Sequence, residues 1–551
     1  MKQGKVIKLP GDAIAAVTGG VSAIPDGMAC GIMAGLDPIQ GIYSTIFGHL
    51  VGSWTTSAVY MSVTTTSALA LATGSALYNI PPEDKLSVVT LITFIAGLIQ
   101  VIMSFFRVDV LLRFVSNAVM RGFLSGIAIQ IILGQIPDFT GYYISEETNR
   151  VIRAADIFLH PTDWNWWIFA SAALTLIIII VIRKTPLKVF SMFLALLIVN
   201  LLSILFDIEE LMLVGEASRI PKDLPIFHIP DYLHIPDFIL SALAIAMIGF
   251  IQGAGVSQIR PNPDGNYPDE SKDLRGQGLA NIFIGFFSGI PVGGSVSSST
   301  LMYSAGARSR WGYFLAGVII ALLVFTLGWL IEKIPLGTLA AILIVTGYDA
   351  LNKKEIATIW KTSLQSRTVM LFSFITTLVL PIQYAVLLSI VLTFFLHVIR
   401  SSNTIKLKSI EPEGEWYRQT TLPDQLESYK VLGIIPYGSL FFAGAFALKR
   451  ILPTTVNAKN PVVIFILRGK EEVGSTFIKV IKAYNDELKS KGGKLILVGV
   501  SENVYQQLER TGTIEQLGHE NVHLATKYVG KIFRQVWEEE QEWVKKKKEE
   551  S

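Results

Sequence analysis

Long apolar segments recur along the first 400 residues, and their recurrence constrains the fold more than any other feature of the sequence. A segment of about 20 apolar residues is long enough to cross a bilayer as a helix. We therefore predict a polytopic α-helical membrane protein with about 14 transmembrane helices within residues 1–403. The long segments lie near residues 12–33, 37–56, 85–106, 118–136, 164–182, 186–206, 236–257, 274–290, 312–332, 367–382 and 384–400, and three shorter ones near 62–77, 295–305 and 336–350.

The remainder of the sequence has a different character. The chain has 551 residues, of which 51% are hydrophobic and 17% charged, which is more apolar than an average soluble protein. From residue 411 onward, however, the composition is typical of a soluble domain. The net charge of +3 is too small to indicate nucleic-acid binding. A single cysteine, Cys30, allows neither an intramolecular disulfide nor a cysteine-based metal site. We predict no metal and no cofactor.

Lysine and arginine gather in alternate loops between the apolar segments. The intervening loops, such as 81–85 and 207–236, are acidic or sparse in cations. Because short cytoplasmic loops are enriched in Lys and Arg, we predict that the N-terminus and the C-terminal domain are cytoplasmic and that the chain spans the inner (plasma) membrane. The cations are Lys2, Lys5 and Lys8; Arg107, Arg113 and Arg121; Arg183, Lys184 and Lys188; Arg260, Lys272 and Arg275; Arg308 and Arg310; and Lys353, Lys354, Lys361 and Arg367.

Two runs of hydroxyl residues occupy corresponding places in the two halves of the membrane region. SVTTTS at 62–67 opens one short segment, and SVSSST at 295–300 opens another. Upstream of each run we predict an interruption in a long helix, one containing Asp26 and the other containing Gln252. The sequence therefore predicts inverted repeats, near residues 10–206 and 234–402, whose interrupted elements converge.

A helix that begins within the membrane with hydroxyl residues offers unpaired N–H groups, O–H donors and the positive end of its dipole. Two such starts would suit an anion lying between them. For one hydroxyl cluster alone, close packing and bonds to the preceding turn are the favoured explanation. Two matched clusters, with the Gly293-Gly294 break before the second, favour a binding site instead. Asp26 is an acid inside a span, so it either serves the pathway or caps the break after Pro25.

Four stretches together resemble the SulP family of anion permeases, which are sulfate permease-like transporters with a C-terminal STAS domain. They are AGLDPIQGIY at 34–43, GFLSG at 122–126, GQGLAN at 276–281 running on to GIP at 289–291, and residues 334–345. The resemblance covers nearly the whole chain. It implies a transporter and not an enzyme, built as a 7+7 inverted repeat with a core domain and a gate domain. It also implies elevator-type alternating access, with an anion held between the two half-helix starts.

Carried onto this chain, the resemblance implies a substrate site with ten residues. The family often has Gly-Pro at positions 64–65, often an acid at Gln252, and in some members an Arg at Ser298. These departures leave the anion and its coupling ion open, with sulfate first and bicarbonate or chloride next. The implied site consists of Asp26, Thr64, Thr65, Thr66, Gln252, Gly294, Ser295, Val296, Ser297 and Ser298.

The coupling ion and several other functions stay open at this point. Gln252 offers a sodium ion a carbonyl oxygen but no charge, and Asp26 is the only carboxylate left at the centre, which favours proton symport. Exchange, uncoupled flux or a channel on the same scaffold are alternatives. A nucleobase permease is an alternative with the same kind of repeats, but members of that class look as if their site has a Glu on the eighth span and another on the tenth. This sequence has neither Glu. A membrane-anchored STAS signalling protein would not need matched half-helices. His49 is interpreted as an interfacial or packing residue.

The tail alternates short apolar strands, near 429–436, 462–467 and 494–499, with helical segments, which indicates an α/β fold. We divide it into a linker at 404–427, a STAS domain at 428–536 and a charged tail at 537–551. Gly474 stands where soluble relatives have an Asp before a phosphorylated Ser, so we interpret Ser475 as a helix N-cap. The resemblance also implies a homodimer, and a cytosolic partner of the STAS domain is left unidentified.

Overall fold

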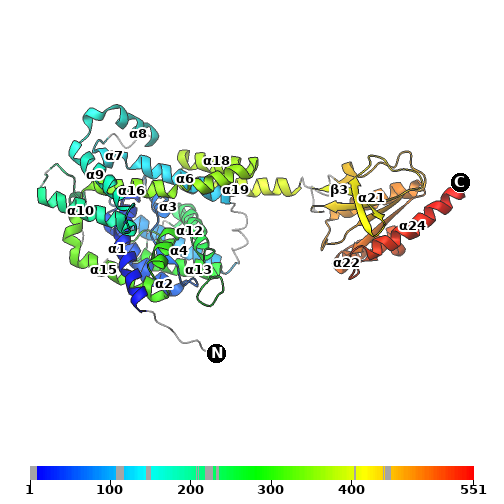
Figure 1. The fold of residues 1–551 in the computed structure, drawn as a ribbon, viewed down its shortest axis with the longest axis horizontal. Coiled ribbons are helices and arrows are strands. Elements are labelled where there is room, and N and C mark those ends of the chain that lie inside the picture. The colour runs from blue at the N-terminus through cyan, green and yellow to red at the C-terminus, as the bar shows by residue number, and fades with distance from the viewer. Residues whose placement is uncertain are drawn as a thin grey trace. The chain divides into compact units, whose positions relative to one another are not determined.

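The computed structural model describes residues 9–106, 117–143, 150–206, 208, 210–217, 227–230, 235–402, 405–438, 440 and 448–550. The chain divides into two compact units, residues 1–393 and 394–551, which are described separately here. The first unit is helical and the second contains a β-sheet (Figure 1). Among the cations used to predict orientation, Lys2, Lys5, Lys8, Arg107 and Arg113 lie outside the described residues.

The elements of the helical unit follow the predicted apolar segments closely. Its first half contains α1 (Leu9–Met33), α2 (Pro38–Thr55), β1 (Ser62–Thr64), α3 (Ser67–Ala76), α4 (Lys85–Ser104), α6 (Asn117–Gly134), α7 (Ile136–Thr140), α8 (Arg150–Leu159), η1 (Pro161–Asp163), α9 (Trp166–Ile182), η2 (Lys188–Phe190), α10 (Ser191–Phe206) and α11 (Val214–Ala217). Its second half contains α12 (Ile235–Ser257), α13 (Glu270–Gly285), β2 (Gly293–Ser295), α14 (Val296–Ser304), α15 (Arg310–Glu332), α16 (Leu336–Ala350), α17 (Lys353–Thr362), α18 (Leu364–Val379) and α19 (Ile382–Ser402).

Several helices have the length or the surface of membrane-spanning elements. Within the described residues, four are long and apolar enough to cross a membrane by length and composition: Pro10–Met33, Lys85–Ser104, Asn117–Thr140 and Pro236–Ser257. Shorter helices such as α9 and α10 are apolar on every side and expose large side chains, including Ile177, Ile180, Leu201 and Leu205. A helix that is apolar all round is stable at a surface only when that surface faces lipid.

The predicted interruptions in the two long helices are wrong. Helix α1 continues through Pro25, and α12 continues through residues 250–253. Proline removes one backbone hydrogen bond from a helix, and neighbouring helices can compensate for that loss inside a membrane. Asp26 therefore lies within a continuous helix, so it does not cap a break.

Contacts divide the helices into two groups. In the first group α13 packs on α4, α2 and α12, and α1 packs on α2 and α15. In the second group α18 packs on α6, and α16 packs on α6 and α9. Helix α1 contacts both α10 and α16, so it lies where the two groups meet. The short helices α3 and α14 belong with the first group because both contact α1 and α12.

The second unit is a six-stranded sheet with the order β4-β3-β5-β6-β7-β8. Strands β5 to β8 are parallel, whereas β3 is antiparallel to both β4 and β5. The strands are β3 (Lys406–Glu413), β4 (Trp416–Thr421), β5 (Val431–Tyr437), β6 (Val462–Ile466), β7 (Lys494–Val500) and β8 (Val522–Leu524), and the helices are α21 (Ser475–Ser490), α22 (Glu502–Arg510), α23 (Thr513–Leu517), η4 (His519–Asn521) and α24 (Lys531–Glu549).

Alternate side chains of the strands face opposite sides of this sheet, and helices cover both sides. Val463 and Phe465 face the side covered by α21 to α23, while Val462 and Ile464 face α24. The structure differs from our expectation at three places. The predicted linker carries β3 and β4, and the predicted charged tail belongs to α24, which buries Val544 against the sheet. The N-cap of α21 is Gly474, and Ser475 is the first helical residue.

Candidate functional site

The two hydroxyl runs fold as predicted, each as the start of a short helix. Thr66 is the N-cap of α3, and its hydroxyl accepts a hydrogen bond from the Leu69 N–H. Ser295 is the N-cap of α14, and its hydroxyl accepts from the Ser298 N–H. The helices have 10 and 9 residues. At 1.5 Å per residue each is roughly 15 Å long, about half the thickness of the bilayer core.

A short antiparallel ladder holds these two starts together. In β1 and β2, Ser62 pairs with Ser295 and Thr64 pairs with Gly293. Helix α3 follows the end of β1 and α14 follows the end of β2, so the helices leave opposite ends of the ladder with both N-termini directed to its middle. A three-residue strand spans about 7 Å from its first Cα to its last. The positive ends of the two helix dipoles therefore lie close together.

Each helix start keeps backbone donors that its cap does not satisfy. The first N–H groups of an α-helix have no carbonyl one turn earlier to bond. Among the residues that the structure describes, the N–H groups without a partner are those of Ser67 and Ala68 in α3 and those of Val296 and Ser297 in α14. Val296 and Ser297 are exposed, whereas Ala68 is buried. The start of α14 is thus the more accessible of the two.

The three threonines of the first run point in two directions. Thr64 and Thr65 are buried, and their hydroxyls lie 3.3 and 3.1 Å from the Thr45 hydroxyl on α2. Thr66 instead donates to Gln252 Oε1 on α12 at 2.9 Å. Of the three, Thr66 is the one in direct contact with another predicted site residue, while Thr64 and Thr65 anchor the run to α2.

The second run is bonded across to the first. Ser298 Oγ lies 2.8 Å from Ser62 Oγ, and Ser62 N–H donates to Ser299 Oγ at 2.9 Å. Gly294 donates its N–H to Gln277, so its backbone donor is used within the scaffold. Ser297 Oγ lies 3.2 Å from Ser295 Oγ. Ser297 therefore presents both an accessible hydroxyl and an unpaired N–H at the start of α14.

His49 belongs to this network, which extends the packing role predicted for it. Its Nε2 lies 3.0 Å from Ser62 Oγ and its Nδ1 lies 2.8 Å from the Thr45 carbonyl. The imidazole is buried between α2 and the ladder. The sequence signal was the four-residue spacing of Thr45 and His49, which places two polar side chains on one face of an apolar helix.

Gln252 lines a hollow between the two helix groups. Its carboxamide oxygen accepts the bond from Thr66, and within the described residues its amide nitrogen has no hydrogen-bond partner. The hollow opens to solvent and has about 380 Å³ of empty space, part of this solvent included. Apolar side chains of α6 and α12, including Phe123 and Ile251, form its walls. Gln252 is thus its polar member, with two N–H donors available.

Asp26 is accessible although the helix around it is buried. Ser22, Asp26 and Cys30 recur every four residues and share one face of α1. The Cys30 thiol is within hydrogen-bonding range of Thr65, so this face points toward the start of α3. In the described part of the chain, the Asp26 carboxylate makes no hydrogen bond or ion pair, and no contact joins it to Gln252.

Sequence reasoning missed the side chains that hold the segment leading into α14. Asn281 accepts from the Val292 N–H at 2.7 Å and donates to the Val292 carbonyl at 2.9 Å. It also donates to Gln100 on α4. Gln277 accepts from the Gly294 N–H at 3.1 Å. These residues lie in the GQGLAN stretch, where their four-residue spacing is the signal that could have identified them.

The turn that leads into β1 is held from two sides. Asp273 on α13 accepts hydrogen bonds from the N–H groups of Ser57 and Ala58 at 2.6 and 2.8 Å, and from the Ser57 hydroxyl at 2.8 Å. Arg310 on α15 donates to the carbonyls of Ser53, Thr56 and Ser57. The Asp273 carboxylate therefore accepts hydrogen bonds from the N–H groups of this turn, and the Arg310 guanidinium donates to its carbonyl groups.

This chain is similar to known proteins over almost its whole length. The sequence profile described as "Sulfate permease family" matches residues 9–373, and the profile described as "STAS domain" matches residues 428–526. YvdB of Bacillus subtilis (strain 168), provisionally named a sulfate transporter, is 26% identical over 519 residues, which cover 93% of this chain and 96% of that protein.

Two solved structures share the fold. The murine Slc26a9 anion transporter in the inward-facing state superimposes with a TM-score of 0.82 at 17% identity, covering 95% of this chain and 91% of that chain. The transmembrane domain of BicA, a cyanobacterial bicarbonate transporter, superimposes with a TM-score of 0.60 at 20% identity, covering 71% of this chain and 98% of that chain.

Proposed function

The chain belongs to the sulfate permease family, a family of multi-pass membrane transporters and not of enzymes, and on this premise we propose that it moves a small inorganic anion by secondary transport. The observation that carries the proposal is the ladder that joins two half-helix starts from separate halves of the chain. Their unpaired N–H groups, the Ser297 hydroxyl and the Gln252 amide are all neutral donors. A desolvated anion is the ligand that such donors favour.

We propose that sulfate is the substrate. Support comes from the name of the family and of relatives such as YvdB, and from the absence of Lys and Arg in both hydroxyl runs, which leaves size and donor geometry to select the anion. Bicarbonate is the second candidate, because BicA shares the fold. Competition by sulfate, bicarbonate and chloride for uptake into proteoliposomes decides between them, and uptake that sulfate does not inhibit would reverse this order.

Alternating access is proposed to occur by an elevator-type movement. The helix group that contains α3 and α14 would be the mobile core, and the group built on α6, α9, α16 and α18 would be the gate. In this scheme α1 to α10 and α12 to α19 form the 7+7 inverted repeats. The apolar walls of the hollow beside Gln252 come partly from α6, which is where a sliding contact between core and gate would lie.

We propose an inner-membrane location with the N-terminus and the STAS domain in the cytoplasm, and a homodimeric assembly. The dimer is expected to give twice the chain mass of 60.6 kDa in light scattering corrected for detergent. A monomer mass over the whole concentration range would contradict the dimer.

Proton coupling through Asp26 is the expected mode of energy coupling. At zero membrane potential, one-for-one proton symport driven by an inward proton gradient of one pH unit raises anion accumulation about tenfold, because about 1.4 kcal/mol corresponds to a factor of ten. We expect this stimulation in the wild type and not in Asp26→Asn. The measurement is anion uptake into proteoliposomes with an inward H⁺ gradient, an inward Na⁺ gradient, or neither.

Asp264→Asn, which changes a carboxylate in the exposed loop between α12 and α13, is the matched control and should keep the stimulation. Stimulation by the Na⁺ gradient alone would show that proton coupling is wrong. Proton-driven uptake that persists in Asp26→Asn would show that another group carries the proton.

A further inference from the structure

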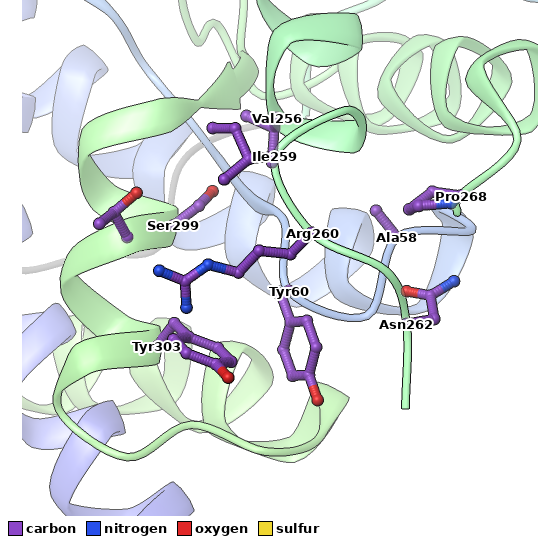
Figure 2. A pocket seen from close by; sticks show the side chains of 10 residues that line it. Ala58, Tyr60, Val256, Ile259, Arg260, Asn262, Pro268, Ser299 and Tyr303 are labelled. Atoms are coloured by element: carbon purple, nitrogen blue, oxygen red, sulfur yellow. The ribbon is translucent and has the colours of Figure 1, made fainter. Parts of the chain in front are cut away.

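A second pocket lies on the helix group that carries the two half-helix starts. It is bounded by the end of α12, by α14 and by the segment that precedes β1, and it opens to solvent, with about 340 Å³ of empty space that includes part of this solvent. We call it the Arg260 pocket. Its polar and aromatic lining consists of Tyr60, Arg260, Asn262, Ser299, Thr300 and Tyr303 (Figure 2).

The Arg260 side chain reaches across this pocket toward α14. Its guanidinium carbon lies 3.6 Å from the centre of the Tyr303 ring, and Figure 2 shows the group above that ring. Stacking fixes the plane of the guanidinium without using its N–H groups. Among the described residues, Arg260 makes no hydrogen bond and no ion pair. It is half-buried, so a permanently charged group with five donors is held ready within the pocket.

A second cation adds to the positive potential. Arg308 lies 4.4 Å from the centre of the same Tyr303 ring and donates to the carbonyls of Tyr303 and Ala307. In the part of the chain that the structure describes, neither guanidinium group is within 4.0 Å of a carboxylate oxygen. Asp12 is close enough to Tyr60 to interact with it electrostatically. Its carboxylate already accepts from the Arg308 and Ser309 N–H groups and from the Ser309 hydroxyl.

Hydroxyl groups of α14 complete the set of donors. Ser299 Oγ accepts from the Ser62 N–H, which leaves its own proton to donate. Thr300 is exposed and, within the described residues, its hydroxyl has no hydrogen-bond partner. The Asn262 carboxamide already has partners, because its oxygen accepts from the Val59 N–H and its nitrogen donates to the Ser57 carbonyl. Arg260 and the α14 hydroxyls are therefore the groups available to a ligand.

The pocket adjoins the start of α14. A Cβ placed on Gly255 would lie 3.8 Å from Val296 Cγ2, and Val256, the next residue of α12, lines the pocket. Ser299 lines the pocket and also bonds the ladder that carries Ser295. An anion in the pocket would thus be about one helical turn from the exposed N–H group of Ser297.

We propose that the Arg260 pocket is a second anion site, which takes the transported inorganic oxyanion on its way to or from the half-helix starts. This inference rests on the proposed function for the identity of its ligand. The guanidinium supplies a two-pronged donor to two oxygens of the anion, and the α14 hydroxyls supply donors to a third. The stacked arginine has a full positive charge, whereas the half-helix starts have no charged side chain. The pocket therefore attracts the anion from solution, and the half-helix starts bind it without a full charge that would slow its release.

The test is a sulfate titration by calorimetry on the full-length protein in lipid nanodiscs, at constant ionic strength. The wild type is expected to bind two sulfate ions per chain, and Ser297→Leu is expected to bind one per chain. In the Ser297→Leu background, adding Arg260→Gln should weaken the remaining site by roughly tenfold to a hundredfold, because a hydrogen-bonded charge is lost. Arg260→Lys, which keeps the charge but not the planar fork, should weaken that site less.

Arg275→Gln is the matched control, because Arg275 is also half-buried and stacks on an aromatic ring, that of Phe105, outside the pocket. Two results in the Ser297→Leu background overturn the proposal. Either Arg260→Gln leaves the remaining sulfate binding unchanged, or Arg275→Gln lowers it as much as Arg260→Gln does. A single site that needs Ser297 alone also overturns it while the proposed function stands. A single site that needs Arg260 alone supports it and contradicts the half-helix site instead.

Two further outcomes count against the pocket as an anion site. If the wild type binds none of sulfate, bicarbonate and chloride, both proposals are wrong. If Arg260→Gln leaves the sulfate titration unchanged but lowers the amount of anionic phospholipid that copurifies with the protein, the occupant is a lipid headgroup and the proposal is wrong.

Discussion

Ser297→Leu is expected to lower anion flux by roughly a hundredfold while the protein still folds. Ser297 is the second residue of α14 and is exposed. Within the described residues, its hydroxyl is bonded only to Ser295 of the same turn. A leucine there is compatible with the helix. It removes one O–H donor, however, and its side chain covers the unpaired N–H groups on which the anion would lie. Flux is measured as tracer uptake into proteoliposomes with matched amounts of protein.

Ser304→Leu is the control for this variant. Ser304 is the last residue of α14 and is also exposed, so the same substitution is made at the opposite end of the same helix. Its flux should stay near that of the wild type. Thr65→Leu is a less specific test, because Thr65 is buried against Thr45 and its replacement would also disturb packing. Equal flux in Ser297→Leu and Ser304→Leu would exclude the start of α14 from the substrate path.

Asp273→Ala is expected to destabilise the helical unit by about 3 kcal/mol or more. The Asp273 side chain is 1% exposed and accepts four hydrogen bonds, from the two N–H groups of Ser57 and Ala58 and from the hydroxyls of Ser57 and Ser257. Alanine leaves the part-buried Ser57 N–H and the buried Ala58 N–H without an acceptor. The loss is measured as a lower melting temperature in detergent and as a lower fraction of monodisperse protein.

Asp273→Asn separates the hydrogen bonds from the charge. Its carboxamide oxygen can still accept from the Ser57 and Ala58 N–H groups. Ser257 already lies 3.0 Å from the Gly253 carbonyl, so its hydroxyl can donate there and accept from the new amide. We expect Asp273→Asn to be much milder than Asp273→Ala. If the two variants were equally unstable, the negative charge of Asp273, which interacts electrostatically with Arg310, would hold the turn, and the hydrogen bonds of Asp273 would not.

The positions of the half-helix starts could be predicted from the sequence because their signals are local. A hydroxyl N-cap followed by a short apolar segment requires only neighbouring residues, as at Thr66 and Ser295. The ladder between these starts could not be predicted, since strands of three residues show no periodicity. Pro25 led to the wrong prediction of a break in α1. A proline has a strong local effect on a helix, but the packing around α1 allows this helix to continue.

The groups that support the site depend on tertiary contacts, and the sequence does not encode these in a readable pattern. Asn281 and Gln277 are conspicuous only once α4 and the segment before α14 are known to lie beside them. In the second unit, β4 is exposed along its length and β3 buries only Leu407 and Ser409 strongly, so the charged stretch around them is typical of a linker. Its pairing with β5 is set by the sheet and not by its own composition.

The ladder also determines when this protein can finish folding during synthesis. The Ser62 N–H finds its acceptor on Ser299, 237 residues further along the chain, so β1 emerges from the ribosome long before β2 exists. Until then the first half enters the bilayer with an extended segment whose polar backbone lacks its partner strand, a state that lipid alone cannot satisfy. The N-terminal half must therefore remain beside the insertion machinery, or beside a membrane chaperone, until translation delivers the second.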